Sequence, residues 1–389
     1  MPIKSFSMVP IKWLDRRGNG VLKENMISVI LPTYNESDNI KVIVTQIVNA
    51  LKSSKMEGEI IIVDDNSPDG TAEVAKELAK DYPIKVCLRK NERGLATAVI
   101  KGFELASGDI CVVMDADLSH PAEKIPDMVK PILEGKCDAT VGSRYVSGGG
   151  CEDWPMIRRF VSRFSGLLAK GLSGLSDPTS GFMAIRKGAL EKVMLDPVGW
   201  KIVLEVIVKT GAMFKEVPIV FADRERGQSK LNTTVQAQYI AHLWKLYHFK
   251  YPLIFQFLKF CIVGFFGLMV DTAVLIGFVE RARLDPRLAA VFAFFCAVSS
   301  NYILNRFWIF DSHGRTNLAT SYAWFVTVCL SGLFVRLGIM HLLIEFFNMG
   351  VGYRYVLASI IGILGATIFN FLGTKFVAFS SKLNKKKRS

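Results

Sequence analysis

The chain has 389 residues, of which 50% are hydrophobic and 21% are charged, and its formal net charge is +13. The apolar content excludes a disordered or collagen-like chain, and the length suggests two or three domains. A mean hydropathy of +0.30 is high for a soluble protein, whereas so many charges are unusual for a protein that lies wholly in a membrane. Two unlike parts are therefore expected.

The basic residues are spread unevenly. From Tyr251 to the end there are 14 Lys and Arg against 5 Asp and Glu, although this is the more apolar part. Basic residues that flank hydrophobic segments are typical of membrane proteins, whereas a nucleic-acid binder carries them on a soluble domain. We therefore expect no nucleic-acid partner. The seven cysteines show no metal-binding spacing and suit buried apolar positions in a reducing compartment.

Residues 1–25 are basic and polar, lack the apolar core of a signal peptide and form a leader of unknown role. After them, β-branched runs alternate with helical patterns. This alternation predicts an α/β domain over residues 26–232, with a mostly parallel sheet covered by helices. The expected strands are Ile27–Pro32, Glu59–Val63, Val86–Leu88 and Ile110–Met114. The first expected helix follows Glu36 and ends at about Leu51, and the next two are Thr71–Ala79 and Gly94–Ala106.

Polar clusters follow three of these strands, at Tyr34–Glu36, Asp64–Asp65 and Asp115–Asp117. Ligands of parallel α/β sheets bind beyond the carboxyl ends of the strands. Two carboxylates that are two residues apart can hold one hard cation, Mg²⁺ or Mn²⁺, whose coordination phosphate oxygens complete. The sequence contains neither a P-loop nor a dinucleotide fingerprint after the first strand. The remaining interpretation is a site that binds a nucleotide through carboxylates and a metal ion.

Thr233–Tyr251 carries aromatic and aliphatic side chains at helical spacings between basic ones. We expect residues 233–252 to form an amphipathic interfacial linker, and a plain core helix is the alternative. Residues 253–380 are expected to form a four-helix transmembrane domain, because four segments have the roughly 20 residues that cross about 30 Å of hydrocarbon. These segments are Phe260–Val279, Leu288–Asn305, Thr316–Val335 and Tyr355–Thr374.

The basic tail, residues 381–389, should stay cytoplasmic. With four crossings, the α/β domain and both termini then lie on the cytoplasmic side of the bilayer. The apolar part also contains a repeat: Phe260–Asp271 aligns with Phe325–Arg336, and Asn301–Phe310 aligns with Asn370–Phe379. The offsets of 65 and 69 residues indicate one duplicated helical hairpin, with both copies in the same orientation.

Several motifs run in order through the first domain. They are Leu31–Glu36, Val63–Asp69, Gly94–Ala98, Lys101–Gly102, Met114–Pro121, Gly142–Tyr145, Trp154–Pro155, Asp177–Phe182, Pro197–Lys201 and Arg224–Lys230. Together they resemble family 2 glycosyltransferases of the glycosyltransferase-A fold, and more closely the dolichol-phosphate mannose synthases. The apolar part resembles the GtrA-type membrane domain that is fused to some of these synthases.

The resemblance implies that GDP-mannose gives its mannosyl group, with inversion, to the phosphate of dolichyl or another polyprenyl phosphate. The product would be dolichyl phosphate mannose for glycan assembly. It implies that the metal is held by Asp115 and Asp117, with Ser119 where some members carry Gln. The implied nucleotide-sugar contacts are Pro32, Tyr34, Glu36, Val63, Asp65, Asp115, Ala116, Asp117, Lys201, Arg224 and Lys230.

A lipid phosphate, with a second pKa of about 6, is mostly dianionic at pH 7 and needs positioning rather than a strong base. Arg144 and Arg158 are the candidate contacts, and Ser162 lies one helical turn after Arg158. The family places acceptor contacts at these positions, and with Asp115 and Asp117 they form the expected catalytic set. His120 is more readily interpreted as structural than as a general base.

Two alternatives stay open. The first is a polyprenyl-phosphate glucosyltransferase that uses UDP-glucose, because motifs for diphosphate and metal do not define the base or the sugar. The second is a lipid-carrier flippase that the soluble domain regulates, because Asp271 and Arg336 lie within apolar segments. A processive polysaccharide synthase is disfavoured, since the sequence lacks Gln-x-x-Arg-Trp.

Overall fold

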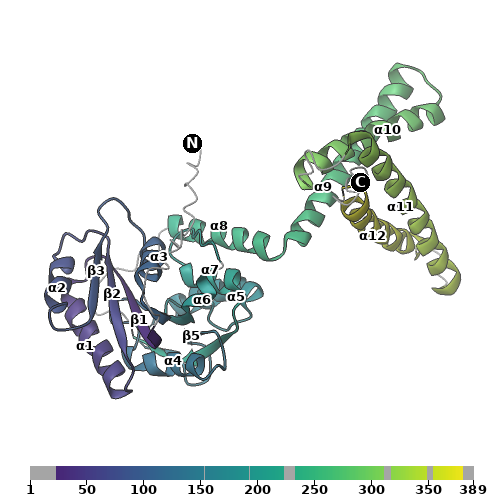
Figure 1. Cartoon of the computed structure of the whole chain (residues 1–389). Coiled ribbons are helices and arrows are strands. Elements are labelled where there is room, and N and C mark those ends of the chain that lie inside the picture. Colours follow the sequence, from purple (N-terminus) through teal and green to yellow (C-terminus); the bar gives the residue numbers. More distant parts are fainter. Residues whose placement is uncertain are drawn as a thin grey trace, which may run out of the picture. The chain divides into compact units, whose positions relative to one another are not determined.

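The computed structural model divides into two compact units, Met1–Lys250 and Tyr251–Ser389 (Figure 1). Residues 1–22 of the expected leader and the basic tail lie outside the part of the chain that the structure describes, as do Arg224 and Lys230. The described residues are 23–152, 154–191, 193–222, 233–310, 317–347 and 354–379.

The first unit is built on a seven-stranded sheet in the order β3-β2-β1-β4-β7-β5-β8. Neighbouring strands are parallel except at β7, which is antiparallel to β4 and to β5. The predicted mostly parallel α/β sheet is confirmed. A separate parallel pair joins β6 to β9. The strands are β1 Lys23–Thr33, β2 Gly58–Asp64, β3 Ile84–Leu88, β4 Gly108–Val113, β5 Ala139–Ser143, β6 Gly150–Cys151, β7 Met183–Arg186, β8 Phe214–Pro218 and β9 Val220–Phe221.

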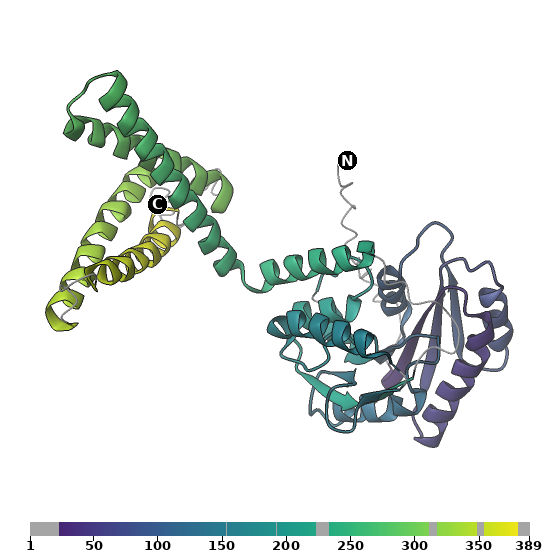
Figure 2. The same cartoon turned by 180° about the vertical axis from the view of Figure 1, so that it is seen from behind.

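Helices cover both faces of this sheet (Figures 1 and 2). Successive side chains of a strand point to opposite faces. Val29 of β1 therefore belongs to the apolar core that includes residues of α1 (Ser37–Ser53) and α4 (Ile125–Leu133), whereas its neighbour Ile30 belongs to the core that includes residues of α3 (Leu95–Leu105) and α7 (Ile202–Thr210). Two apolar cores therefore enclose the sheet. The helices of this unit are α1 Ser37–Ser53, α2 Thr71–Leu78, α3 Leu95–Leu105, η1 Ala122–Lys124, α4 Ile125–Leu133, α5 Met156–Ser173, α6 Lys187–Leu190, α7 Ile202–Thr210 and α8 Thr233–Lys250.

The first strand begins earlier than expected, at Lys23 rather than Ile27. Lys23 pairs with Gly108 of β4, and the register shifts before Ile27, where Asn25 adopts a positive φ of 69°. Such a bulge lets pairing continue across a local irregularity. Gly108 is needed there, because a Cβ at this position would lie 2.4 Å from the carbonyl oxygen of Met26.

The last helix of the first unit, α8, packs against α5 and α7. Its side chains Leu243 and Leu246 are buried, whereas Ile240 and Trp244 are exposed. The helix therefore has one face on the α/β domain and leaves large apolar side chains on another.

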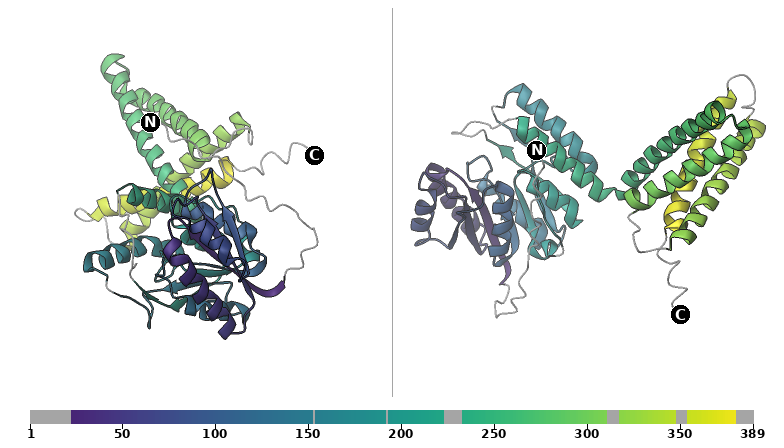
Figure 3. Two further views of the ribbon diagram at one scale, coloured as in Figure 1. Left: turned by 90° about the vertical axis from the view of Figure 1, so that its left-hand side faces the viewer. Right: turned by 90° about the horizontal axis from the view of Figure 1, so that it is seen from above.

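The second unit consists of two helical hairpins (Figures 1 and 3), one of α9 (Pro252–Ile276) with α10 (Pro286–Leu304) and one of α11 (Leu318–Phe347) with α12 (Arg354–Gly373). Of the four expected crossing segments, three correspond to helices that are long and apolar enough to span a membrane: Pro252–Arg281, Leu318–Phe347 and Ile360–Ala378. The segment Leu288–Asn305 is also helical, but α10, with 19 residues, is not among these candidates. The elements are α9 Pro252–Ile276, η2 Gly277–Arg281, α10 Pro286–Leu304, η3 Asn305–Ile309, α11 Leu318–Phe347, α12 Arg354–Gly373 and η4 Thr374–Ala378.

Equivalent positions of the sequence repeat make equivalent contacts within each hairpin. A Cβ on Gly267 would lie 2.2 Å from the side chain of Asn301, and one on Gly332 would lie 2.1 Å from that of Asn370. In each hairpin, the lack of a side chain on the glycine lets the asparagine amide of the second helix pack directly against the backbone of the first helix. The π-helical turns η3 and η4 also begin at equivalent positions, four residues after each asparagine.

The contacts between the hairpins are reciprocal. The ring of Tyr302 in α10 meets Tyr322 of α11 at 5.1 Å, and the equivalent Phe371 in α12 meets Phe257 of α9 at 5.3 Å. In the same frame, Arg306 donates to Ser321 Oγ at 2.9 Å, and Lys375 donates to Gln256 Oε1 at 2.8 Å. A two-fold relation between two copies produces such reciprocal pairs.

Candidate active site

The predicted acidic pair follows β4 at the carboxyl edge of the sheet. Asp117 is 7% exposed, and its Oδ1 accepts the Ser119 hydroxyl at 2.5 Å and the Ser119 N–H at 3.2 Å. Leu118 adopts a positive φ of 65°, which turns the chain between these two residues. Ala116 is buried beneath the turn. The hydroxyl of Ser119 therefore points at Asp117 and not into the sheet.

His120 holds the start of this turn through a hydrogen bond to the backbone of Asp115. Its Nδ1 accepts the backbone N–H of Asp115 at 3.0 Å, and its ring, 2% exposed, stacks on Phe182 at 5.3 Å and meets Phe221 edge-on at 5.4 Å. A buried imidazole nitrogen that already accepts a backbone hydrogen bond holds the strand end in place. This geometry fits the structural interpretation of His120.

The acidic pair fits a hard divalent cation. Asp115, Asp117 and Ser119 offer only oxygen atoms, which Mg²⁺ and Mn²⁺ prefer. Gly181 leaves room beside the pair, since a Cβ there would lie 3.4 Å from Asp115 Oδ2. Within the described ranges, no group of three or more His, Cys, Asp and Glu could hold a metal ion. Two carboxylates would therefore need ligands from a bound substrate, such as diphosphate oxygens.

Asp65 is held by an arginine that the sequence analysis missed. The buried Arg89, just after β3, donates from Nε to Asp65 Oδ1 at 2.7 Å, and the Gly94 N–H donates to Asp65 Oδ2 at 2.8 Å. Arg89 also bonds Thr97 and the Gly94 carbonyl, so it ties the start of α3 to the strand ends. The sequence marks Arg89 only by its position directly after a strand, which does not indicate its partner.

The other expected nucleoside contacts lie along the same edge. Pro32 and Val63 are register partners at the ends of β1 and β2, and both are buried. Tyr34 is exposed, with the guanidinium of Arg93 4.9 Å from the centre of its ring. The backbone N–H of Glu36 donates to Thr71 Oγ1 at 2.9 Å, where α1 begins. Tyr34 and Glu36 are therefore better placed than the two buried residues to offer side chains to a ligand.

Arg144 forms a buried ion pair with Asp177, which was not expected from the sequence. Arg144 donates from Nε at 2.7 Å and from Nη2 at 2.8 Å to the two carboxylate oxygens. Burial would raise the pKa of Asp177, but the hydrogen bonds and charge of Arg144 hold that pKa below its ordinary value. The charge that Arg144 offers to an anion is therefore reduced by Asp177.

The loop Asp177–Gly181 brings the separate parts of the site together. The Thr179 hydroxyl accepts Arg144 Nη2 at 3.3 Å, and the Thr179 carbonyl accepts a hydrogen bond from Lys201 Nζ. Gly181, at the end of the loop, lies against Asp115 and His120. One loop thus contacts Lys201, which is expected to bind the nucleotide sugar, Arg144, which is expected to bind the lipid phosphate, and Asp115, which is expected to bind the metal. The sequence showed this loop only as a matching motif.

The remaining acceptor candidates lie on α5. The Arg158 guanidinium is 4.1 Å from the centre of the Trp154 ring, and the Ser162 hydroxyl accepts the Tyr145 hydroxyl at 2.8 Å. Tyr145 directly follows Arg144, so α5 and the end of β5 face each other through these side chains. The structure therefore brings Arg144, Arg158 and Ser162 into one neighbourhood.

Lys201 begins α7 and sits in an unusual environment for a lysine. Its Nζ lies 3.7 Å from the centre of the Trp200 ring. Burial, and then the charge of Arg144, lowers the pKa of Lys201 to about 7. A small change of pH, or an anionic ligand, can therefore change its charge.

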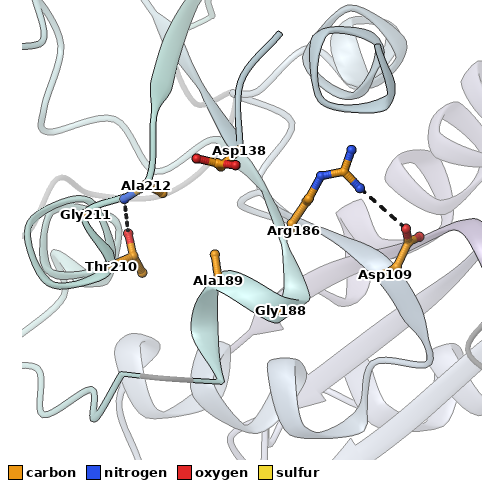
Figure 4. A pocket seen from close by; sticks show the side chains of 8 residues that line it. All are labelled: Asp109, Asp138, Arg186, Gly188, Ala189, Thr210, Gly211 and Ala212. Atoms are coloured by element: carbon orange, nitrogen blue, oxygen red, sulfur yellow. Dashed lines mark hydrogen bonds and ion pairs between the residues drawn. The ribbon is translucent and has the colours of Figure 1, made fainter. Parts of the chain in front are cut away.

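Figure 4 shows a pocket whose lining residues include Asp109, Asp138 and Arg186. Asp109 at the start of β4 and Asp138 just before β5 place it at the opposite end of these strands from Asp115. Arg186 faces Asp109 at 3.9 Å across it. The pocket is therefore not part of the candidate active site.

Two sections of the chain match known families. Residues 28–194 match glycosyl transferase family 2, and residues 259–379 match the GtrA/DPMS transmembrane domain. A dolichol-phosphate mannosyltransferase of Pyrococcus furiosus is 38% identical over 344 residues, which is 87% of this chain and 95% of the relative. One of Saccharomyces cerevisiae is 39% identical over 236 residues, which is 58% of this chain and 88% of the relative.

Solved structures are more distant. Glucosyl-3-phosphoglycerate synthase of Mycobacterium tuberculosis is 19% identical, with a TM-score of 0.45, over 57% of this chain and 80% of that chain. This likeness is too weak to support a functional conclusion. The family matches and the near full-length relative are sufficient: the chain belongs to the family 2 glycosyltransferases, in the form that carries a GtrA/DPMS transmembrane domain after the glycosyltransferase domain.

Proposed function

We propose that this glycosyltransferase moves mannose from GDP-mannose to the phosphate of dolichyl phosphate or another polyprenyl phosphate, with inversion at the sugar carbon. Relatives that are 36–39% identical carry the name dolichol-phosphate mannosyltransferase, which supports both the sugar and the lipid. The observation that carries the proposal is the loop Asp177–Gly181, which connects the acidic pair, Lys201 and the arginine neighbourhood.

The donor would lie along the carboxyl edge of the sheet. Tyr34, Glu36 and Asp65 would contact the nucleoside, with Pro32 and Val63 as the floor beneath it. Asp115 and Asp117, with Ser119, would hold Mg²⁺ or Mn²⁺, which neutralises the charge that develops on the departing GDP. Lys201 bonds the loop whose end, Gly181, lies against Asp115, so we expect it to contact the same diphosphate. Arg224 and Lys230 remain proposed donor contacts on the sequence resemblance alone.

The acceptor phosphate would enter on the arginine side. Arg158, with Arg144, orients the phosphate, and a phosphate oxygen attacks the sugar carbon on the face opposite the departing GDP. The new carbon–oxygen bond forms as the bond to the diphosphate breaks, which inverts the configuration. Because the phosphate is already ionised, no side chain needs to remove a proton.

The membrane side of the proposal rests on α5 and the second unit. Met156, Ile157 and Phe160 on α5 are 85%, 80% and 72% exposed, on the helix that carries Arg158. We infer that this apolar surface and α8, the linker 233–252, face the bilayer. Residues 253–380 would then cross it four times, with α10 as a fourth span. The catalytic domain 26–232, the leader and the tail 381–389 would be cytoplasmic.

A transfer assay tests this proposal. Purified protein in detergent receives Mg²⁺, dolichyl phosphate and one radiolabelled nucleotide sugar at a time. Label should move to the lipid from GDP-mannose, and dolichol without phosphate should accept none. Label from UDP-glucose alone would favour the glucosyltransferase. No transfer, together with movement of lipid-linked sugar across vesicles by the Asp117→Ala protein, would favour the flippase.

The lowered pKa of Lys201 predicts a pH dependence of donor binding. Below pH 7 the free enzyme holds Lys201 mostly charged, and above pH 7 mostly neutral. If the charged form contacts the diphosphate, the affinity for GDP-mannose should fall about tenfold between pH 6 and pH 8. Titration calorimetry with Mg²⁺ present measures this change. Lys201→Arg keeps its charge and should show little slope, so an equal slope in the variant would contradict the role of Lys201.

A further inference from the structure

Trp154 has no role in the steps above, yet it lies at the centre of the arginine neighbourhood. It lies two residues before the start of α5 and is 7% exposed. Its ring lies 4.1 Å from the guanidinium carbon of Arg158 and 5.3 Å from that of Arg144. Two cations from different elements, the first turn of α5 and the end of β5, therefore share one indole.

The electrostatics of the ring explain this arrangement. Two guanidinium groups near one another repel, whereas an indole face attracts each of them, most strongly where water is excluded. Asp177 neutralises Arg144. The ring is thus a contact by which the half-buried Arg158 is held close to Arg144.

The indole nitrogen of Trp154 also indicates that ring contacts position this side chain. Trp154 Nε1 is buried and makes no hydrogen bond among the described residues. A buried indole N–H usually finds a partner. Ring contacts with the cations and with Phe221, edge-on at 5.4 Å, therefore define where this side chain lies.

Phe221 extends these contacts to the acidic pair. It packs on both Trp154 and His120 at 5.4 Å, and His120 accepts the backbone N–H of Asp115. A continuous set of packed rings thus joins the arginine neighbourhood to the strand end that carries the metal carboxylates. Close packing transmits displacement, so a shift of Trp154 changes where Arg158 lies relative to Asp115.

We propose that Trp154 is a positioning residue for the acceptor: it holds Arg158, and through it the lipid phosphate, at a fixed place opposite the acidic pair. It does not touch the reacting atoms. This inference rests on the proposed function, since it assumes that Arg158 binds the acceptor phosphate.

A double-mutant cycle tests the role. Trp154→Leu should raise the KM for dolichyl phosphate about tenfold, the order of a cation–π contact in a desolvated site, with the KM for GDP-mannose within about twofold of wild type. Trp154→Phe keeps a ring face and should recover most of the loss. In the Arg158→Ala background, Trp154→Leu should add little, because the cation it positions is gone. Arg159→Ala, on the exposed neighbour in α5, is the matched control and should behave as wild type.

Three results would overturn the proposal. They are an equal rise of both KM values in Trp154→Leu, a Trp154→Phe protein as impaired as Trp154→Leu, and independent effects of Trp154 and Arg158 that multiply in the double variant. If Trp154→Leu does not fold, the same cycle is run with Trp154→Met, which also lacks a ring face, and effects that multiply there count against the proposal equally.

Direct binding separates this inference from the proposed function. Immobilised protein without any sugar donor is offered dolichyl phosphate or dolichol, and the retained lipid is measured. Wild type should prefer the phosphate and Trp154→Leu should lose most of that preference. A preference that survives in Trp154→Leu overturns the inference alone. A wild type without preference overturns the proposed function, and the inference with it.

Discussion

Asp117→Asn should lower the rate of mannosyl transfer by about 1000-fold or more while the protein remains folded. Loss of one preorganised group that stabilises developing charge costs about 100- to 1000-fold in turnover, and a carboxylate that holds the cation should cost at least as much. Both Ser119 donors bond Asp117 Oδ1, and the amide oxygen of Asn can still accept them, so the turn should be kept. Steady-state rates at saturating Mg²⁺ measure the effect.

A matched control separates this loss from a general effect of removing an acidic charge. Asp127 lies exposed on α4, paired with Lys124 at 2.9 Å, so Asp127→Asn should keep wild-type turnover. If Asp117→Asn keeps the wild-type turnover and the wild-type dependence on Mg²⁺, the cation is held elsewhere.

Asp177→Ala should destabilise the glycosyltransferase domain by about 3–5 kcal/mol, the typical effect of removing one partner from a buried ion pair. The variant leaves the buried Arg144 charge without its carboxylate and releases the backbone N–H of Arg144, which Asp177 accepts at 3.1 Å. Chemical unfolding in detergent, followed by the fluorescence of the first unit, measures the loss. The double variant Arg144→Met with Asp177→Leu should recover part of it, because no charge is then buried.

The same pair predicts the direction of a pH effect. The folded-state pKa of Asp177 is below its ordinary value, so the stabilisation is fully present above about pH 4 and is lost as the pH falls through the lowered pKa. An Asp177→Ala protein as stable as wild type at pH 7 would show that the ion pair contributes nothing to the fold.

The order of the first four strands and of the three helices between them could be predicted because each has a local sequence pattern. The β-branched runs gave β2 and β4 within two residues, and the acidic residues that follow β4 lie at the sheet edge where parallel strands place ligands. The start of β1 could not be predicted, because the bulge at Asn25 depends on pairing with β4, which is about 80 residues away.

The connections within the site were also beyond sequence reasoning. Arg144 and Asp177 are 33 residues apart, and Arg89 and Asp65 are 24 apart. Neither spacing has a local period, so only the fold shows that these charges meet. Arg158 was named through the family resemblance. Its contact with the Trp154 ring was not predicted, because a tryptophan before a proline does not indicate a nearby cation.

The repeat in the second unit could be predicted from the sequence, but the contacts between its two copies could not. The sequence offsets identify Arg306 and Lys375 as equivalent positions. Their partners, Ser321 and Gln256, are also equivalent, but the residue types differ, so the reciprocal bonds could not be foreseen. Recurrence of residues predicts duplication, and the fold is needed to show which side chains meet between the copies.

The central claim is that the carboxylates after β4 grip a cation and a sugar diphosphate beside the arginines that receive a lipid phosphate. Crystals soaked with Mn²⁺ and GDP-mannose test it directly, because Mn²⁺ can be located by anomalous scattering. The account predicts one strong peak between the Asp117 carboxylate and the diphosphate, with the sugar carbon facing Arg158. Bound nucleotide with its manganese away from Asp115 and Asp117, or with its sugar facing away from Arg158, would contradict it.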